Sequence, residues 1–160
     1  MLVKIRRMTE DEFERFYQWS VEDHAKELMG ELNISREEAI METKKEVAGM
    51  LPDGFHTEHN DFVTIVAEEE NAGFIWAVYE QSQGRKQCFL CDFAVWELKR
   101  RKGYGEMAMR LLEKRAVEAG CEEMVLFVAD QNDSAKALYK KCGYQDLRQE
   151  SYGKYMVKRL

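Results

Sequence analysis

In the first third of the chain, apolar residues first recur at every second position, as in a strand, and then at every third or fourth position, as in a helix. Residues 2–7 alternate between the two kinds, which predicts an opening strand with one buried face. Residues 9–12 carry the capping-box pattern that begins a helix, and the helical spacing continues until Gly30. Ser35 repeats the start signal for a second helix, which is expected to end at Pro52.

The middle of the chain changes to short segments rich in β-branched and aromatic residues. Residues 62–67 and 74–79 predict a hairpin whose turn falls in residues 70–73. Residues 88–96 are almost continuously apolar and are interrupted by Asp92. Such a segment is typical of a central strand that is buried on both faces.

The last third returns to helical spacing and then alternates between helices and strands. Its elements are a helix from Tyr104 to Gly120, a strand over residues 124–128, a short helix from a cap at Asn132 to Gly143, and a strand over residues 155–160. The resulting element order predicts an α/β fold, an α+β arrangement in which helices flank a mixed sheet. Without repeats or a linker, residues 1–160 are expected to form a single domain.

Composition narrows the class of protein. The 160 residues are 45% hydrophobic, and the formal net charge is −6. The chain lacks both a run of eighteen apolar residues and a signal peptide, so we expect a cytoplasmic protein without a membrane partner. The negative charge disfavours nucleic acid as a partner and favours cationic molecules near an acidic cleft.

Four cysteines raise the question of a metal site. Two of them, Cys88 and Cys91, form a C-x-x-C pair, and the others are Cys121 and Cys142. The pair lies within an apolar strand, where residues three apart point to opposite faces, instead of in a tight metal-binding turn. We therefore expect free thiols and no metal.

A cluster of cations precedes the third helix. Residues 99–102 are all Lys or Arg, and the glycines Gly103 and Gly105 follow at the expected start of the helix. Unpaired N–H groups at a helix N-terminus attract anions, and glycines allow close approach of the backbone to phosphates. This basic loop matches a ligand that carries a pyrophosphate and a phosphomonoester, which is the charge pattern of coenzyme A.

Two other interpretations of the basic loop are open. It could be a solvated loop before an ordinary helix. Alternatively, Gly103, Gly105 and Ala108 fit the G-x-G-x-x-A dinucleotide pattern, and Glu123 lies twenty residues beyond the first glycine. That pattern should directly follow a strand near the start of a βαβ unit, whereas here a hairpin and a cationic loop precede it.

The motif Arg100-x-x-Gly103-x-Gly105 resembles the R/Q-x-x-G-x-G/A signature of the GNAT superfamily of N-acetyltransferases. The preceding residues 93–95 resemble the central strand of that family, and residues 132–144 resemble its next conserved block. The chain is therefore similar to small stand-alone bacterial members of unassigned acceptor. The resemblance implies a GNAT-like fold and acetyl-CoA as co-substrate, with no metal.

The resemblance also implies roles for individual residues. N–H groups of residues 101–106 would bind the pyrophosphate, the strand before the basic loop would pair with pantetheine, and Tyr139 would protonate the departing thiolate as general acid. The implied cofactor-binding residues are Phe93, Ala94, Val95, Arg100, Arg101, Lys102, Gly103, Tyr104, Gly105, Glu106, Asn132, Ala135 and Tyr139. Asn132 could equally act as a helix cap, and Tyr139 as a core aromatic residue.

The proton acceptor does not follow from the resemblance. The two strand positions where a glutamate is expected hold Phe89 and Phe127. Asp92 is the acid within the apolar strand, and it serves either as the catalytic base or as a structural anchor. His56 and His59 are candidate acceptor contacts, as is Tyr79, although aromatic residues on strands are usually core residues. Asp92, His56, His59 and Tyr79, together with Tyr139, are the predicted catalytic and substrate-binding residues.

We expect direct acetyl transfer to a primary amine in a ternary complex. The partner would be a small amine or a peptide amine, and a homodimer is one open alternative for the assembly. Two other functions are weighed against this one: an acyl-CoA sensor or interaction module on the same fold, and a dinucleotide-dependent oxidoreductase.

Overall fold

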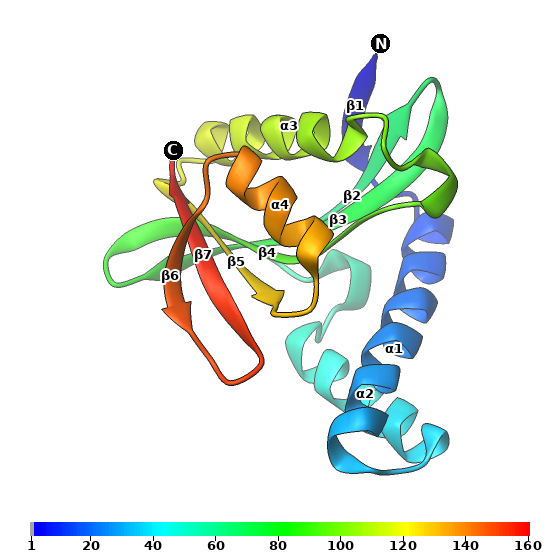
Figure 1. Ribbon diagram of the computed structural model, residues 1–160. Coiled ribbons are helices and arrows are strands. Elements are labelled where there is room, and N and C mark those ends of the chain that lie inside the picture. Colours follow the sequence, from blue (N-terminus) through cyan, green and yellow to red (C-terminus); the bar gives the residue numbers. More distant parts are fainter. Residues whose placement is uncertain (1) are drawn as a thin grey trace. The chain divides into compact units, whose positions relative to one another are not determined.

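The computed structural model describes residues 2–160, which divide into two compact units. Residues 2–7 and His59–Leu160 form the sheet unit, and Met8–Glu58 form the helical unit (Figure 1). The single domain expected over residues 1–160 stays a prediction. No helix within residues 2–160 has both the length and the apolar character that are needed to cross a bilayer.

The helical unit contains α1 (Glu10–Leu32), α2 (Arg36–Met50) and the short η1 (Gly54–His56). The predicted capping box is confirmed, since Glu12 N donates to Thr9 Oγ1 at 3.2 Å and Thr9 N donates to Glu12 Oε1 at 2.9 Å. Helix α1 continues past Gly30, where it was expected to end. It ends instead at Leu32 and is capped by Asn33, which adopts the left-handed conformation (φ 52°) and whose N–H donates to Met29 O.

The sheet unit is built on one seven-stranded mixed sheet. Its strands are β1 (Val3–Arg7), β2 (Asn60–Ala67), β3 (Glu70–Ser82), β4 (Arg85–Val95), β5 (Glu123–Ala129), β6 (Gln145–Gln149) and β7 (Gly153–Arg159). The spatial order is β1-β2-β3-β4-β5-β7-β6, in which β4 and β5 pair in parallel and all other pairs are antiparallel. The short η2 (Glu97–Lys99), α3 (Tyr104–Glu118) and α4 (Asp133–Lys141) complete the unit. The predicted α/β class with a mixed sheet is confirmed.

One strand prediction was wrong in detail, and one strand was missed. The hairpin turn falls at Glu68 and Glu69, which both adopt positive φ, so β3 already begins at Glu70. Strand β6 was not predicted. All five of its residues are exposed, so its sequence lacks the alternation of apolar and polar residues that marks a half-buried strand.

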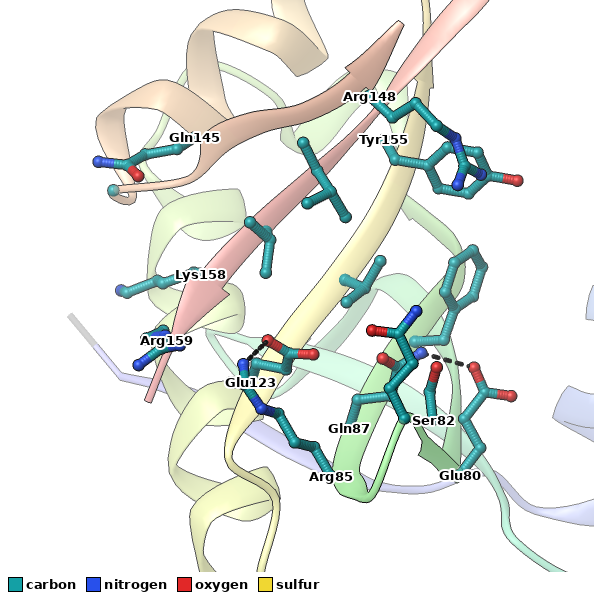
Figure 2. A pocket seen from close by; sticks show the side chains of 16 residues that line it. Glu80, Ser82, Arg85, Gln87, Glu123, Gln145, Arg148, Tyr155, Lys158 and Arg159 are labelled. Carbon is teal, nitrogen blue, oxygen red and sulfur yellow. Dashed lines mark hydrogen bonds and ion pairs between the residues drawn. The ribbon is translucent and has the colours of Figure 1, made fainter. Parts of the chain in front are cut away.

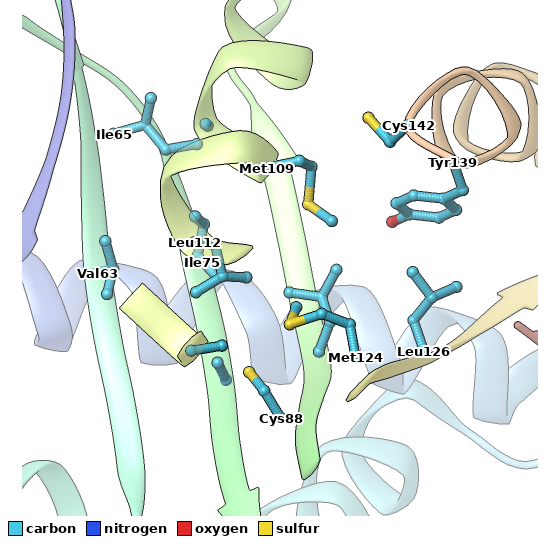
Figure 3. Packing of buried hydrophobic residues seen from close by; sticks show 14 of the residues in the cluster. Val63, Ile65, Ile75, Cys88, Met109, Leu112, Met124, Leu126, Tyr139 and Cys142 are labelled. Atoms are coloured by element: carbon cyan, nitrogen blue, oxygen red, sulfur yellow. The ribbon is translucent and has the colours of Figure 1, made fainter. Parts of the chain in front are cut away.

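One face of the sheet carries the hydrophobic core under α3 and α4. Cys88 and Leu90 of β4, together with Met124 and Leu126 of β5, belong to the same buried cluster as Leu112 of α3 (Figure 3). Because side chains alternate along a strand, the residues between them point to the opposite face. The expectation that β4 is buried on both faces is therefore wrong in part, since Phe89 and Cys91 are only partly buried.

Candidate active site

Strands β4 and β5 separate in the middle of the sheet. Their parallel pairing joins residues 87–90 to residues 123–126 and goes no further within the described chain. On its other edge β4 stays paired with β3 as far as Val95, with a register shift that leaves Cys91 as the extra residue of a β-bulge. Beyond Leu90, residues 93–95 of β4 consequently have no neighbouring strand on the β5 side within the described chain. We call this gap the β4–β5 opening.

The basic loop brings a row of N–H groups to the start of α3. The first helical hydrogen bond runs from Met107 N to Gly103 O at 3.2 Å, and the backbone N–H groups of residues 101–106 find no acceptor among residues 2–160. Arg101 and Gly103 adopt positive φ, 63° and 82°, which turns the chain sharply into the helix. Together with the helix dipole, these N–H groups form an anion-binding site.

The cations of the basic loop have different surroundings. Arg100 Nε donates to Val95 O at 2.8 Å, which ties the loop to the end of β4. Lys99 pairs with Glu70 at 3.3 Å. Arg101 and Lys102 are exposed and form no ion pair with any of residues 2–160. These two cations are therefore available to an anionic ligand.

Gly105 connects the anion site to the β4–β5 opening. A Cβ atom at this position would lie 3.3 Å from Leu138 Cδ2, 3.7 Å from Phe93 Cζ and 3.8 Å from Val95 Cγ2. Gly105 is partly buried in the first turn of α3, in agreement with its expected place at the start of that helix. The anion-binding site at the start of α3 therefore lies next to residues 93–95, the part of β4 that borders the β4–β5 opening.

Helix α4 brings Tyr139 to the core side of the sheet. Its side chain is 7% exposed and belongs to the buried cluster, near Met109 and Leu126 in the close-up view (Figure 3). The hydroxyl makes no hydrogen bond with any of residues 2–160. Burial, followed by the nearby Asp92 carboxylate, raises the pKa of Tyr139 above its ordinary value. Such a phenol stays protonated at neutral pH and can donate a proton.

Asn132 begins α4, and its role as a helix cap is confirmed. Its Oδ1 accepts a hydrogen bond from Ala135 N at 3.2 Å. Asn132 as a whole is exposed. Contact of Asn132 and Ala135 with a bound cofactor stays a prediction.

Asp92 is partly buried, whereas the sequence had suggested full burial. Its Oδ1 accepts from the backbone N–H of Phe93 at 3.1 Å. It follows the bulge residue Cys91 and pairs with Trp76 across the β3–β4 ladder. The carboxylate therefore lies at the β4–β5 opening, close enough to Tyr139 to affect its pKa.

Tyr79, predicted as an acceptor contact, takes part in a polar network under α3. Its hydroxyl donates to Asp61 Oδ2 at 2.9 Å, and Arg115 of α3 donates to both oxygens of the same carboxylate, at 2.7 and 3.0 Å. Burial and the Asp61 carboxylate raise the pKa of Tyr79. This geometry gives Tyr79 a structural role that joins β2, β3 and α3.

The two histidines lie in different units. His56 is exposed in the helical unit, where its Nε2 lies 3.6 Å from Glu10 Oε1. His59 is exposed in the sheet unit with φ 65°, and its carbonyl accepts from Tyr79 N at 2.8 Å. Their proposed contact with an acceptor stays a prediction.

The cysteines are free thiols in the structure. Cys88, Cys121 and Cys142 are buried, and Cys91 is partly buried. Burial, followed by the carboxylates of Glu80 and Asp92, raises the pKa of the Cys91 thiol to about 12. Across residues 2–160, no three His, Cys, Asp or Glu side chains gather in an arrangement that could hold a metal ion.

Sequence reasoning missed two features of this region. The bulge at Cys91 carries no local signal, because bulges depend on the partner strand. Phe89 and Phe127 were noted only as replacements for expected glutamates. In the structure they belong to a group of aromatic rings on the sheet face opposite α3.

Comparison with known proteins gives a consistent picture. The Acetyltransferase (GNAT) family matches residues 6–144. The Bacillus subtilis protein named Uncharacterized N-acetyltransferase YdgE is 31% identical over 145 residues, which span 90% of this chain and 92% of the relative.

Solved structures share the fold. The crystal structure of the putative acetyltransferase YycN from Bacillus subtilis superposes with a TM-score of 0.84 at 25% identity, covering 93% of this chain and 96% of that one. The PaiA N-acetyltransferase of Thermoplasma acidophilum, solved in complex with coenzyme A, has a TM-score of 0.71 at 19% identity over the full length of both chains.

Proposed function

The chain belongs to the Acetyltransferase (GNAT) family, and from that premise we propose that it transfers the acetyl group of acetyl-CoA directly to a primary amine. The observation that carries the proposal is the junction of two backbone features. The β4–β5 opening leaves one edge of residues 93–95 without a neighbouring strand, and the N–H row of residues 101–106 begins beside the end of that opening. An extended ligand with an amide-containing arm and a pyrophosphate matches both.

Acetyl-CoA would bind with its pyrophosphate at the N-terminus of α3. N–H groups of residues 101–106 would donate to the phosphate oxygens, and the free cations Arg101 and Lys102 would balance the remaining charge. The pantetheine arm would lie along residues 93–95 and form strand-like hydrogen bonds there. The complex of the PaiA protein with coenzyme A supports the capacity of this fold to hold such a ligand.

The transfer requires one bond to form and one to break. The nitrogen of a neutral amine attacks the thioester carbonyl carbon, so that a C–N bond forms while the C–S bond breaks. The sulfur leaves as a thiolate and takes a proton, and the nitrogen loses one. The products are an amide and the free thiol of coenzyme A.

Tyr139 and Asp92 are the groups that we assign to these proton transfers. Tyr139 stays protonated because burial raises its pKa, and its hydroxyl is free to donate to the departing sulfur. An alkyl ammonium with a pKa of about 10 must lose a proton before it can attack. Asp92, at the opening, would accept that proton directly or through water.

Incubation of the protein with acetyl-CoA and a panel of amines, followed by detection of the released thiol, tests the proposal. The panel should include aryl-alkyl amines, polyamines, an aminoglycoside, amino acids and a peptide with a free N-terminus. Amine-dependent thiol release is the expected result. Binding of acetyl-CoA without release with any amine would instead support an acyl-CoA sensor, the function suggested by phenylalanine at both expected glutamate positions.

A further inference from the structure

Four aromatic rings form a continuous surface on the sheet face opposite α3 and α4. Phe127 lies 5.1 Å from Tyr155 and 5.3 Å from Tyr152 between ring centroids, and Phe89 lies 6.4 Å from Tyr155. We call Phe89, Phe127, Tyr152 and Tyr155 the aromatic wall. These rings come from β4, β5 and β7 and from the turn before β7, so the wall crosses three strands.

The backbone of β7 holds Phe127 in place. A Cβ atom at Gly153 would lie 2.5 Å from Phe127 Cζ and 2.5 Å from Val128 O, so only glycine leaves room for the ring. Tyr152 and Tyr155 flank that glycine along the chain. The Phe127 ring thus packs across Gly153, between two tyrosines, and its orientation is fixed before any ligand binds. Binding of a ligand to this ring would therefore cost little side-chain entropy.

The aromatic wall begins where the β4–β5 opening begins. Leu90 and Leu126 are the last residues to pair between the two strands, and Phe127 is the next residue of β5. Because Leu126 points to the core, Phe127 points to the other face. A molecule that rests on Phe127 therefore has its end at the opening, where the thioester would lie.

The wall continues into a cavity of about 860 Å³ on the same face, which is the size of a site for a drug-sized molecule. Phe89 and Tyr155 belong to the aromatic wall and also line this cavity. Val125 and Val157 add apolar surface to the cavity lining. Figure 2 shows Arg148 lying beside the Tyr155 ring, and its guanidinium carbon is 4.7 Å from the ring centroid.

Charges around the cavity do not favour a polycation. Both carboxylates that line it are engaged, because Glu80 accepts from Gln87 Nε2 at 2.7 Å and Glu123 pairs with Arg85 at 3.8 Å. Arg159 adds positive charge to the lining, whereas Arg148 pairs with Glu150 at 2.9 Å. A ligand with several ammonium groups would meet Arg159 and would find both lining carboxylates already in a hydrogen bond or an ion pair.

From this arrangement we infer that the acetyl acceptor is a primary amine carried on an apolar, preferably aromatic, body that packs against the rings of Phe127 and Tyr155. The inference rests on the proposed function and specifies its substrate class. Contact with the aromatic wall would hold the body of the acceptor, with its amine directed to the β4–β5 opening. Phe127 and Tyr155 are then determinants of acceptor specificity.

The test compares three acceptors, 2-phenylethylamine, ethanolamine and spermidine, on the wild-type protein and on variants. We expect kcat/KM for 2-phenylethylamine to exceed that of the other two by about tenfold or more. Phe127→Leu and Tyr155→Leu keep apolar volume but remove the aromatic face, so each should reduce that preference about tenfold while KM for acetyl-CoA stays unchanged. Val117→Ala, at an exposed apolar position on α3, is the control variant.

A second measurement separates failure of this inference from failure of the proposed function. Calorimetric titration of 2-phenylethylamine into the protein saturated with coenzyme A reports acceptor binding without turnover. Binding that Phe127→Leu and Tyr155→Leu weaken about tenfold supports the aromatic wall even if no amine is acetylated. Preference for spermidine or ethanolamine, equal loss for all amines in the variants, or neither binding nor turnover of 2-phenylethylamine would overturn the inference.

Discussion

Replacement of Tyr139 by phenylalanine removes one hydroxyl from the centre of the proposed reaction. That hydroxyl makes no hydrogen bond within residues 2–160, and its ring is 7% exposed in the core, so the variant should fold with unchanged packing. A positioned general acid accelerates a reaction by about 10²-fold or more. We therefore expect kcat to fall by roughly 10²-fold, which corresponds to about 2.7 kcal/mol of transition-state stabilisation, with no change in the Kd of acetyl-CoA.

Tyr144→Phe provides a matched control, because the two rings are neighbours with centroids 5.9 Å apart. The Tyr144 hydroxyl donates to Glu113 Oε2 at 3.1 Å, and Lys158 donates to the other oxygen at 2.7 Å. Loss of this buried hydrogen bond should destabilise the fold by about 1–2 kcal/mol, seen as a lower Tm, and leave turnover per folded molecule unchanged.

The assay is thiol release at saturating acetyl-CoA with the best acceptor from the amine panel, measured from pH 7 to pH 10. Because the pKa of Tyr139 is raised, its phenol stays protonated as the pH rises through this range, so the wild-type rate should not fall through loss of the acid. Wild-type kcat in Tyr139→Phe would refute the assignment and make Tyr139 a packing residue.

Three further predictions concern other positions of the site. Gly105→Asp should abolish the rise in Tm that acetyl-CoA produces, because the carboxylate would meet the pyrophosphate; Gly105→Ala tests whether the added Cβ, 3.3 Å from Leu138, is tolerated by the fold. Asp92→Asn keeps an oxygen for Phe93 N but cannot take a proton, so kcat/KM should fall most steeply below the pH optimum; unchanged turnover would make Asp92 an anchor. Iodoacetamide should alkylate Cys91 slowly at pH 8 and faster as the pH approaches its pKa of about 12, whereas rapid labelling at pH 8 by mass spectrometry would contradict the assigned burial.

Local signals in the sequence were sufficient for most elements of the fold. The cap residues Thr9, Ser35 and Asn132 begin helices as predicted, because a cap satisfies N–H groups within a few residues of itself. Gly103 was also assigned correctly to the start of α3, where its positive φ suits a residue without Cβ.

Features that depend on pairing between distant segments were not predictable in the same way. Strand β6 is defined by its hydrogen bonds to β7 and not by a hydrophobic pattern. The bulge at Cys91 arises from the register of β4 with β3 and interrupts the alternation of side chains along β4. The sheet face to which Asp92 points therefore could not be predicted from the sequence. The aromatic wall joins Phe89 to Tyr155 across β5, a contact between residues far apart in the chain.

Calorimetric titration of acetyl-CoA into the purified protein tests the central claim most directly, namely that the β4–β5 opening and the N-terminus of α3 together hold this co-substrate. The expected result is one molecule bound per chain with a Kd between roughly 1 μM and 1 mM, the range of enzyme KM values. A parallel titration with NADH should give no binding. Absence of acetyl-CoA binding, or comparable binding of NADH, would contradict the account.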